Sequence, residues 1–323
     1  MEMDKKLVVS SSPHIRSIDS VQSVMTDVLI ALFPVALMAV LLFGYQALLT
    51  MAISVATAML VEALWLKKKD IFSDGSAAVT GLLFAMVLPP AAPWWLVVIG
   101  TAMAIIIGKQ VFGGIGYNIF NPALVGRAIV AVSWGSHMVG TVWSSPEPFA
   151  FGADIAAVTT ATPLAGEAQA QAVTLAQLFV GNVPGCLGET SAFALLVGAA
   201  WLFYKGHIDW RVPVGFIGTV FVLGTLLGGG FYENHLLTGF FHVLAGGVML
   251  GALFMATDMV TSPVTSIGKL IFGIGCGLIT ILIRLWGTMP EGVTFAILMM
   301  NAFTPIIDNF TVPKQFGGVK KSA

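Results

Sequence analysis

The sequence predicts an all-α membrane protein with about ten spanning helices, and three observations lead to that prediction. First, 57% of the 323 residues are hydrophobic and only 10% are charged, whereas about a quarter of the residues in a soluble domain carry a charge. Second, the apolar residues form continuous runs near the length that crosses a bilayer as a helix. Third, apart from Arg127 and Arg284 within the runs, Lys and Arg are confined to alternate connections and the run ends beside them.

Ten apolar runs define the expected spanning helices. Their boundaries are 24–43, 45–66, 77–92, 93–112, 122–143, 190–204, 212–229, 238–256, 267–287 and 291–310. The runs at 77–92 and 190–204 are short for a bilayer crossing, so we expect these two segments to be tilted or broken.

The charges of the connections predict which side of the membrane each one faces. One alternating set carries the basic residues Lys5, Lys6, Arg16, Lys67, Lys68, Lys69, Lys109, Lys205, Arg211, Lys269, Lys314, Lys320 and Lys321. The other set has no Lys or Arg within these boundaries and carries Glu147, Asp154, Glu167, Glu189, Glu233 and Glu291. Because basic connections stay in the cytoplasm, we expect both termini to be cytoplasmic and the acidic connections to lie outside.

The longest connection divides the chain into three parts. Residues 1–143 form an N-terminal tail and a first set of five helices, 144–189 form an outer loop, and 190–323 form a second set of five helices and a tail. Because five is odd, the second set runs through the membrane in the opposite sense to the first. This counting predicts an inverted repeat of the kind found in transporters.

The outer loop contains the stretch Thr159-Thr160-Ala161-Thr162. Thr, Ala and Pro are ordinary turn residues, and Thr can cap a helix, so one interpretation is a simple turn. The other interpretation is covalent modification of a hydroxyl, either by a glycan or by a cofactor that carries a phosphate. The residues by themselves leave both interpretations open.

The threonine stretch is similar to the flavinylation motif Ser/Thr-Gly-Ala-Thr, although Thr160 replaces Gly and Asp154 is displaced from the usual upstream position. Three further segments occur in order: GGIGYNIFNPALVGRA at 113–128, GETSAFALLVG at 188–198 and FMATDMVTSPVTSIGKLIFG at 254–273. Together they resemble the family that contains the D subunit of the Rnf complex and the homologous B subunit of the sodium-translocating NADH:quinone oxidoreductase. The likeness covers nearly the whole chain, and the short N-terminal extension favours the Rnf protein.

The resemblance implies a fold and a function. The fold would be urea-transporter-like, and the chain would be one component of an ion pump that passes electrons between reduced ferredoxin and NAD and moves Na⁺ or H⁺. FMN would be held by a phosphoester bond to Thr162, attached outside the cytoplasm by a flavin transferase. Riboflavin would bind without a covalent bond near Asn118 and Asn121. The partners implied are the other Rnf subunits, and the membrane is the cytoplasmic membrane of a bacterium or archaeon.

The remaining residues indicate no catalytic or metal-binding role. The net charge of −1 gives no support for nucleic-acid binding, and Cys186 and Cys276 are too far apart in sequence to indicate a zinc or iron–sulfur site in this chain alone. Ionisable residues in or near spans tend to mark pathways or pairs. They are Asp27, Glu62, Arg127, His242, Arg284 and Asp308. Of these, Glu62 precedes the basic stretch at 67–69 and could simply reach the inner membrane surface.

Alternatives accompany the motif segments and the overall function. Asn121 before Pro122 is also typical of a helix N-cap. Thr190 or Ser191 is typical of a helix cap, with Glu189 placed to complement the helix dipole. Residues 257–266 are typical of a hydroxyl-rich turn. The rival function is a solute channel or transporter without a redox role. That class explains the helices but not the outer threonine motif, and a purely structural subunit is a third interpretation.

Overall fold

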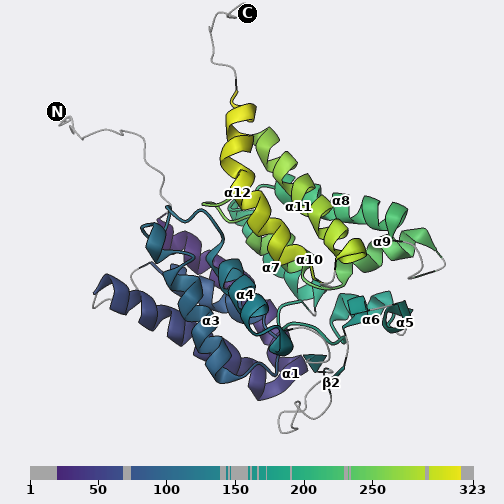
Figure 1. Cartoon of the computed structure of the whole chain (residues 1–323), viewed down its shortest axis with the longest axis horizontal. Helices are drawn as coiled ribbons and strands as arrows, with labels where there is room; N and C mark the ends of the chain where they lie inside the picture. The colour runs from purple at the N-terminus through teal and green to yellow at the C-terminus, as the bar shows by residue number, and fades with distance from the viewer. Residues whose placement is uncertain are drawn as a thin grey trace, which may run out of the picture.

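A computed structural model describes residues 20–67, 74–138, 143–144, 146, 159–160, 162–165, 167–171, 173–189, 191–228, 232, 234–287 and 291–313. Within these residues the regular secondary structure is helical, apart from one short antiparallel pair of strands, β1 (Trp143–Ser144) with β2 (Thr159–Thr160). The pair joins the two ends of a segment of the outer loop. Figure 1 shows that β2, α5 and α6 lie at the end of the molecule away from the last turn of α12.

The helices follow the chain in two groups on either side of this loop. The first group is α1 (Val21–Leu66), α2 (Ser76–Met86), α3 (Trp94–Ile106), η1 (Gln110–Phe112), α4 (Pro122–Ser133) and η2 (Gly135–His137). The loop carries η4 (Pro163–Ala165), α5 (Glu167–Gln171) and α6 (Leu175–Val180). The second group is α7 (Ala192–Lys205), α8 (Arg211–Leu227), α9 (His235–Leu244), α10 (Val248–Leu250), the π-helix η5 (Gly251–Met255), α11 (Ser266–Trp286) and α12 (Val293–Thr311).

Each apolar run expected from the sequence coincides with a helix or with a broken helix. The first two runs are joined in α1, whose backbone leaves helical geometry at Gly44 with φ 65° and ψ −149°. Glycine tolerates this positive φ because it has no Cβ. The run at 238–256 is broken between α9 and α10, where the chain bends by 63°.

Two runs form shorter helices than expected. The run at 77–92 is helical only to Met86, because Pro89 disfavours helical geometry at the residue before it. The run at 122–143 is helical only to Ser133, and Gly135 begins a short 3₁₀ turn soon after it. Both expected boundaries are therefore too long, since apolar composition does not record where the backbone leaves the helix.

The described helices establish a multi-pass membrane protein. Four stretches are long and apolar enough to cross a bilayer, and the bent pair of α9 with α10–η5 would be a fifth. They are Val21–Leu66, Trp94–Phe112, Ser266–Trp286 and Val293–Thr311. The remaining apolar helices, α2, α4, α7 and α8, have 10 to 17 residues each.

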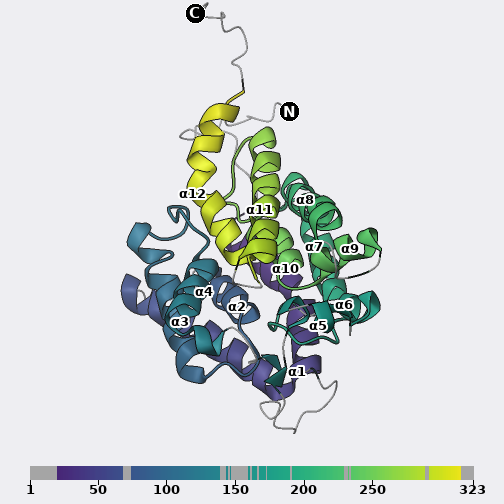
Figure 2. The ribbon, with the colours of Figure 1, turned by 45° about the vertical axis from the view of Figure 1, so that its right-hand side comes forward.

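The two groups of helices repeat the same order of packing. In the first group, the second half of α1 packs on α2 and α3, and the Ser54 hydroxyl donates to Gly81 O at 2.6 Å and lies 3.0 Å from the Thr101 hydroxyl. In the second group, α8 packs in the same way on α9 and α11. α3 then packs on α4 as α11 packs on α12. Figure 2 shows the first group, purple to blue, beside the second, green to yellow.

Small residues allow the close approach between these helices. A Cβ added to Gly273 of α11 would lie 2.5 Å from Val212 O of α8. A Cβ added to Gly198 of α7 would overlap Ala31 O of α1, and this contact joins the two groups. Glycine at helix interfaces is the usual means of close packing in membranes, where no hydrophobic effect drives helices together.

Candidate functional site

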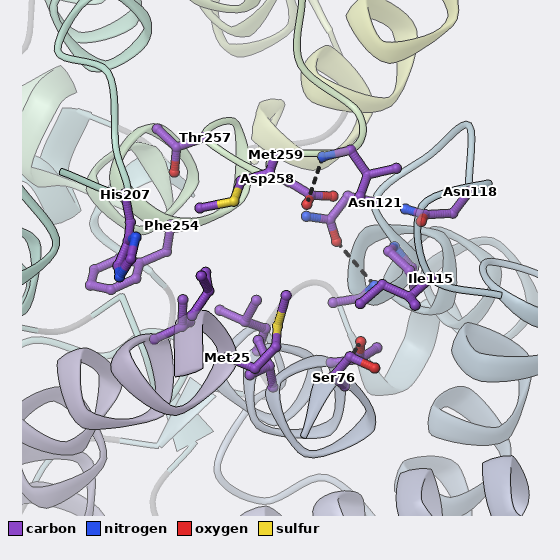
Figure 3. Close-up of a pocket in the computed structure, with 18 of the residues that line it drawn as sticks. Met25, Ser76, Ile115, Asn118, Asn121, His207, Phe254, Thr257, Asp258 and Met259 are labelled. Carbon is purple, nitrogen blue, oxygen red and sulfur yellow. Dashed lines mark hydrogen bonds between the residues drawn. The ribbon is translucent and has the colours of Figure 1, made fainter. Parts of the chain in front are cut away.

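A cavity with about 860 Å³ of empty space, part of it open to solvent, lies between the two groups of helices. Its lining is mainly apolar, and its polar side chains are Ser76, Thr80, Lys109, Asn118, Asn121, His207, Thr257 and Asp258. In the view of Figure 3, Asn118 and His207 lie on opposite sides of this cavity. We call it the asparagine cavity.

Asn121 begins α4 and connects the two groups of helices. Its side-chain oxygen accepts from the backbone N–H groups of Ala123 at 3.1 Å and Leu124 at 3.4 Å, and Pro122 occupies the first helical position. The N-cap interpretation is therefore confirmed. Its amide nitrogen also donates to Met255 O at 3.2 Å, at the end of η5. This long-range bond has no signal in the sequence.

Asn118 lines the same cavity from the turn that precedes α4. It is buried, and its amide nitrogen donates to Phe120 O at 3.2 Å. Three glycines shape this turn: Gly113, Gly114 and Gly116, with φ values of 116°, 96° and 89°. Residues other than glycine rarely adopt such positive φ values. The two asparagines singled out in the sequence therefore share one cavity.

A buried ion pair forms one wall of the asparagine cavity. The Lys109 ammonium group donates to both carboxylate oxygens of Glu62, at 2.9 and 2.8 Å, and to the Ser76 hydroxyl at 2.5 Å. The position of Glu62 before the basic stretch suggests a side chain that extends to the membrane surface. Its carboxylate is instead buried in the protein and paired with Lys109. Three acceptors satisfy the three ammonium protons, which is the condition for burying such a charge.

Two acidic residues hold the loops around the cavity. Asp27 accepts from His207 Nε2 at 2.9 Å and lies 3.5 Å from Lys205 Nζ. Asp258 is in the turn after η5, where it accepts from Val260 N at 3.3 Å and from the Thr261 hydroxyl at 3.1 Å. The expected hydroxyl-rich turn is thus confirmed. Burial raises the pKa of the Asp258 carboxyl above its ordinary value.

Thr162 lies at the other end of the molecule, next to η4. Its hydroxyl oxygen accepts from Leu164 N at 3.4 Å, and only 4% of the residue is exposed. A hydroxyl that is modified in an outer loop is expected to be accessible to solvent. The burial of Thr162 corrects that expectation. Asp154, the displaced acidic residue of the motif, lies outside the described residues.

A buried cluster of charges centres on Arg127 of α4. Arg127 forms an ion pair with Glu291, lies 4.0 Å from a Glu189 oxygen and donates to Cys186 Sγ at 3.3 Å. It also donates to Val87 O, the carbonyl that ends α2. The sequence places Arg127 inside a helix but gives no sign of its partners, and it indicates for Glu189 only a complement to a helix dipole. Ser191 does cap α7, accepting from Ala194 N at 3.3 Å.

A glycine pair connects this charge cluster with the turn at Thr162. A Cβ on Gly246 would lie 2.7 Å from Leu164 Cδ1 and 3.0 Å from Arg284 Nη2, and one on Gly247 would lie 2.7 Å from Glu189 Oε1. Gly246 also has a φ of 67°. The break between α9 and α10 therefore brings the backbone against the loop that carries Thr162.

Arg284 closes the end of α9 at this break. Its guanidinium donates to His242 O at 2.5 Å and to Ala245 O at 2.8 Å. Helix carbonyls at a C-terminus have no partner within the helix, so a guanidinium satisfies them. Arg127 and Arg284, two of the ionisable residues noted in the sequence, thus both bind helix ends. A third, Asp308, accepts a hydrogen bond from Val264 N at 3.1 Å in the turn before α11.

Cys186, Glu189 and Glu291 form the one group in the described chain with the donor types and spacing of a metal site, their ligand atoms lying within 4.8 Å of one another. The guanidinium of Arg127 already engages Cys186 and Glu291. The positive charge of Arg127 therefore balances the carboxylates of Glu189 and Glu291. The arrangement fits a structural charge network better than a metal centre.

Comparison with known proteins gives a consistent result over the whole chain. The family model described as "NQR2, RnfD, RnfE family" matches residues 8–317. The D subunit of the Na⁺-translocating ferredoxin:NAD⁺ oxidoreductase complex of Acetobacterium woodii is 46% identical, over 97% of this chain and 96% of that protein. The D subunit of the proton-translocating ferredoxin:NAD⁺ oxidoreductase complex of Clostridium ljungdahlii is 45% identical, over 96% of each chain. The D subunit of the ion-translocating oxidoreductase complex of Stutzerimonas stutzeri is 39% identical, over 92% of each chain. Helices, motifs and relatives thus agree that the chain belongs to the NQR2, RnfD, RnfE family.

Proposed function

We propose that this chain is the flavin-carrying membrane subunit of an ion-translocating ferredoxin:NAD⁺ oxidoreductase of the Rnf type. The observation that carries the proposal is the match, along nearly the full length, to proteins whose names state this activity. In the complex, electrons pass between reduced ferredoxin and NAD and drive Na⁺ or H⁺ across the membrane. Relatives named for either ion are about equally similar to this chain, so assays should follow both ions.

The chain's attachment point for FMN is the hydroxyl of Thr162. FMN, when attached, supplies redox chemistry in one-electron and two-electron steps. The Thr162 oxygen keeps its lone pairs in a phosphoester, so the hydrogen bond that it accepts from Leu164 N is compatible with the modification. A covalent bond holds the cofactor at a high local concentration near its redox partner. The transferase would have to reach Thr162 before the loop packs, because the residue is buried.

The asparagine cavity is the site proposed for riboflavin. Its mainly apolar walls suit an aromatic ring system, and the amides of Asn118 and Asn121 can donate to or accept from the polar edge of a flavin. Lys109, a cation in the wall, is neutralised by Glu62 and has its three protons engaged. A flavin without a phosphate therefore matches this cavity better than FMN does.

The topology proposed is ten spanning helices in two inverted sets of five, in a urea-transporter-like arrangement. Three observations support it: the odd number of runs on each side of the long loop, the repeated packing order of the two groups, and the segregation of Lys and Arg. Both termini and Asn118 would lie on the cytoplasmic side of the membrane of a bacterium or archaeon, and Thr162 on the outer side.

The partners proposed are the other subunits of the Rnf complex, the surrounding lipid bilayer, and a flavin transferase during maturation. The chain alone is not expected to oxidise ferredoxin, because its described residues include no iron–sulfur ligand set. The two flavin sites at opposite ends would let electrons cross the membrane through this protein and its neighbours.

The test is covalent flavin on the purified chain after co-expression with the transferase. A denaturing gel under ultraviolet light should show a fluorescent band for the wild-type chain, and intact mass should show an added FMN. Thr162→Ala should remove both signals because no hydroxyl remains, while Thr162→Ser should retain part of them. A fluorescent Thr162→Ala band would refute the attachment site, and a dark wild-type band would favour a channel without redox function.

A further inference from the structure

One face of α12 carries a row of polar side chains, and the helix is otherwise apolar until Asn309 and Thr311 in its last turn. The row begins at Glu291, just before the helix, and continues with Thr294, Asn301, Thr304 and Asp308. The spacings of three, seven, three and four residues place them on one side of an α-helix. Thr294 and Asn301 are buried, so this side faces the protein and not lipid.

The two ends of the row contact residues at opposite ends of the molecule. Glu291 pairs with Arg127 near the Thr162 end. At the other end, the Thr304 hydroxyl donates to Thr261 O at 3.0 Å, and Asp308 accepts from Val264 N. The row therefore has polar side chains at both ends of the protein and Asn301 between them, with the buried apolar Ile297 in the interval before Asn301.

Asn301 lies in the middle of this row and has an unusual environment. Only 1% of the residue is exposed. Among the residues that the structure describes, neither its amide nitrogen nor its amide oxygen has a hydrogen-bond partner. An amide in an apolar interior without partners is costly, and such groups in proteins are normally satisfied by water or a ligand.

The π-helix η5 lies opposite this part of α12. Ile297 Cδ1 would be 3.4 Å from a Cβ on Gly251, at the start of η5, and Thr304 reaches Thr261 beyond its end. Asn301 stands between these two contacts, one turn after Ile297. It is therefore level with the end of the broken helix, where backbone geometry is irregular. Single π-helical turns are rare and often occur at functional sites.

We infer that Asn301 binds water at the middle of a hydrated polar passage along α12, through which the translocated cation crosses. The inference rests on the proposed function, since it presupposes that the complex moves an ion. The inference assigns a location to the crossing of the ion, which the charge pattern of the sequence does not locate.

The chemistry of the amide selects water as its ligand. A bare metal cation would satisfy the oxygen of Asn301 but would leave its buried N–H₂ group without an acceptor. Water can donate to the oxygen and accept from the nitrogen, so it satisfies both. The cation therefore passes this point with hydrating water or as a proton transferred between waters, and not as a stripped ion.

The test uses the whole complex in sealed membrane vesicles supplied with reduced ferredoxin and NAD⁺. Asn301→Leu removes both hydrogen-bonding groups and keeps the number and branching of the side-chain heavy atoms, and Met300→Leu on the same turn is the control for an apolar change of shape. Three quantities are measured for each variant: covalent flavin fluorescence, electron transfer in vesicles made leaky to ions, and uptake of ²²Na⁺ and of protons in sealed vesicles.

For Asn301→Leu we expect fluorescence and electron transfer in leaky vesicles close to those of the wild type, with ion uptake per electron reduced about tenfold, the effect of losing one buried polar partner. Met300→Leu should keep both. Wild-type uptake in Asn301→Leu would overturn the inference. If Asn301→Leu does not assemble, Asn301→Ser and Asn301→Val replace it: uptake kept by Ser and lost by Val supports the passage, and equal uptake in both overturns it.

The controls separate this inference from the proposed function. If Asn301→Leu transports normally while Thr162→Ala is dark, only the passage is refuted. If wild-type vesicles take up no ion with reduced ferredoxin, or Thr162→Ala stays fluorescent, the proposed function itself fails.

Discussion

Replacing Lys109 by Met should strongly destabilise the protein, because it leaves the Glu62 carboxylate buried without its partner. The two side chains are 3% and 11% exposed. Lys109 makes two charge-assisted hydrogen bonds to Glu62, at 2.9 and 2.8 Å, and a third to Ser76. Removing one member of a buried ion pair costs about 3–5 kcal/mol, whereas replacing both by apolar residues of similar size is often neutral. The double variant Lys109→Met, Glu62→Met should therefore be clearly more stable than Lys109→Met alone.

The assay is a double-mutant cycle of thermal unfolding in one detergent, with Glu62→Met as the second single variant. The expected coupling between the two positions is about 2–3 kcal/mol or more, because neighbours within one network do not add. The reasoning would be refuted if the two single losses simply summed in the double variant. Additive losses would mean that water already screens this pair and that the wall of the asparagine cavity is wet.

Two further predictions concern the loop at the Thr162 end and the pH dependence of stability. Gly246→Ala should raise covalent flavin fluorescence at equal protein amounts, because its Cβ would displace Leu164 and delay the packing that buries Thr162. Gly206→Ala, also at a positive φ but in open space, should leave the signal unchanged. Equal signals in the two variants would contradict this reasoning. In the α7–α8 connection, burial of Asp209 disfavours its charge, but the Arg211 backbone N–H and the nearby basic side chains outweigh it and hold the pKa of this carboxyl below its ordinary 3.8. A lowered folded-state pKa contributes stability above about pH 4, and this contribution is lost as the pH falls through the folded-state pKa. Asp209→Asn should therefore show a smaller loss of thermal stability below about pH 4 than the wild type. Parallel curves of thermal stability against pH for the two proteins would refute this prediction.

The local features of this protein are predictable because their causes lie within a few residues. Apolar runs locate the helices, since backbone groups inside a bilayer must bond to one another. The pair Asn121-Pro122 starts α4 through bonds to the next two N–H groups, and Asp258 organises its turn through residues two and three positions further on. In each case the partner is close in sequence, so the pattern of residue types is sufficient.

The pairing of buried charges is not predictable for the opposite reason. Glu62 and Lys109 are 47 positions apart, and Arg127 and Glu291 are 164 apart. A charged residue in an apolar run signals that a partner exists, but any of several residues could be that partner. Only the packing of one helix against another selects it.

Sequence alone therefore determined the class of the protein, the positions of its helices, the motif at Thr162 and the two asparagines of the cavity. The tertiary structure decided that these asparagines share one cavity and that the turn after Thr162 packs against a broken helix. It also decided that Asn301 of α12 finds no hydrogen-bond partner among the residues that are described. Composition and short motifs report interactions along the chain. The enclosure of a cavity and the satisfaction of a buried polar group depend on which distant segments meet, and that is settled when the helices pack.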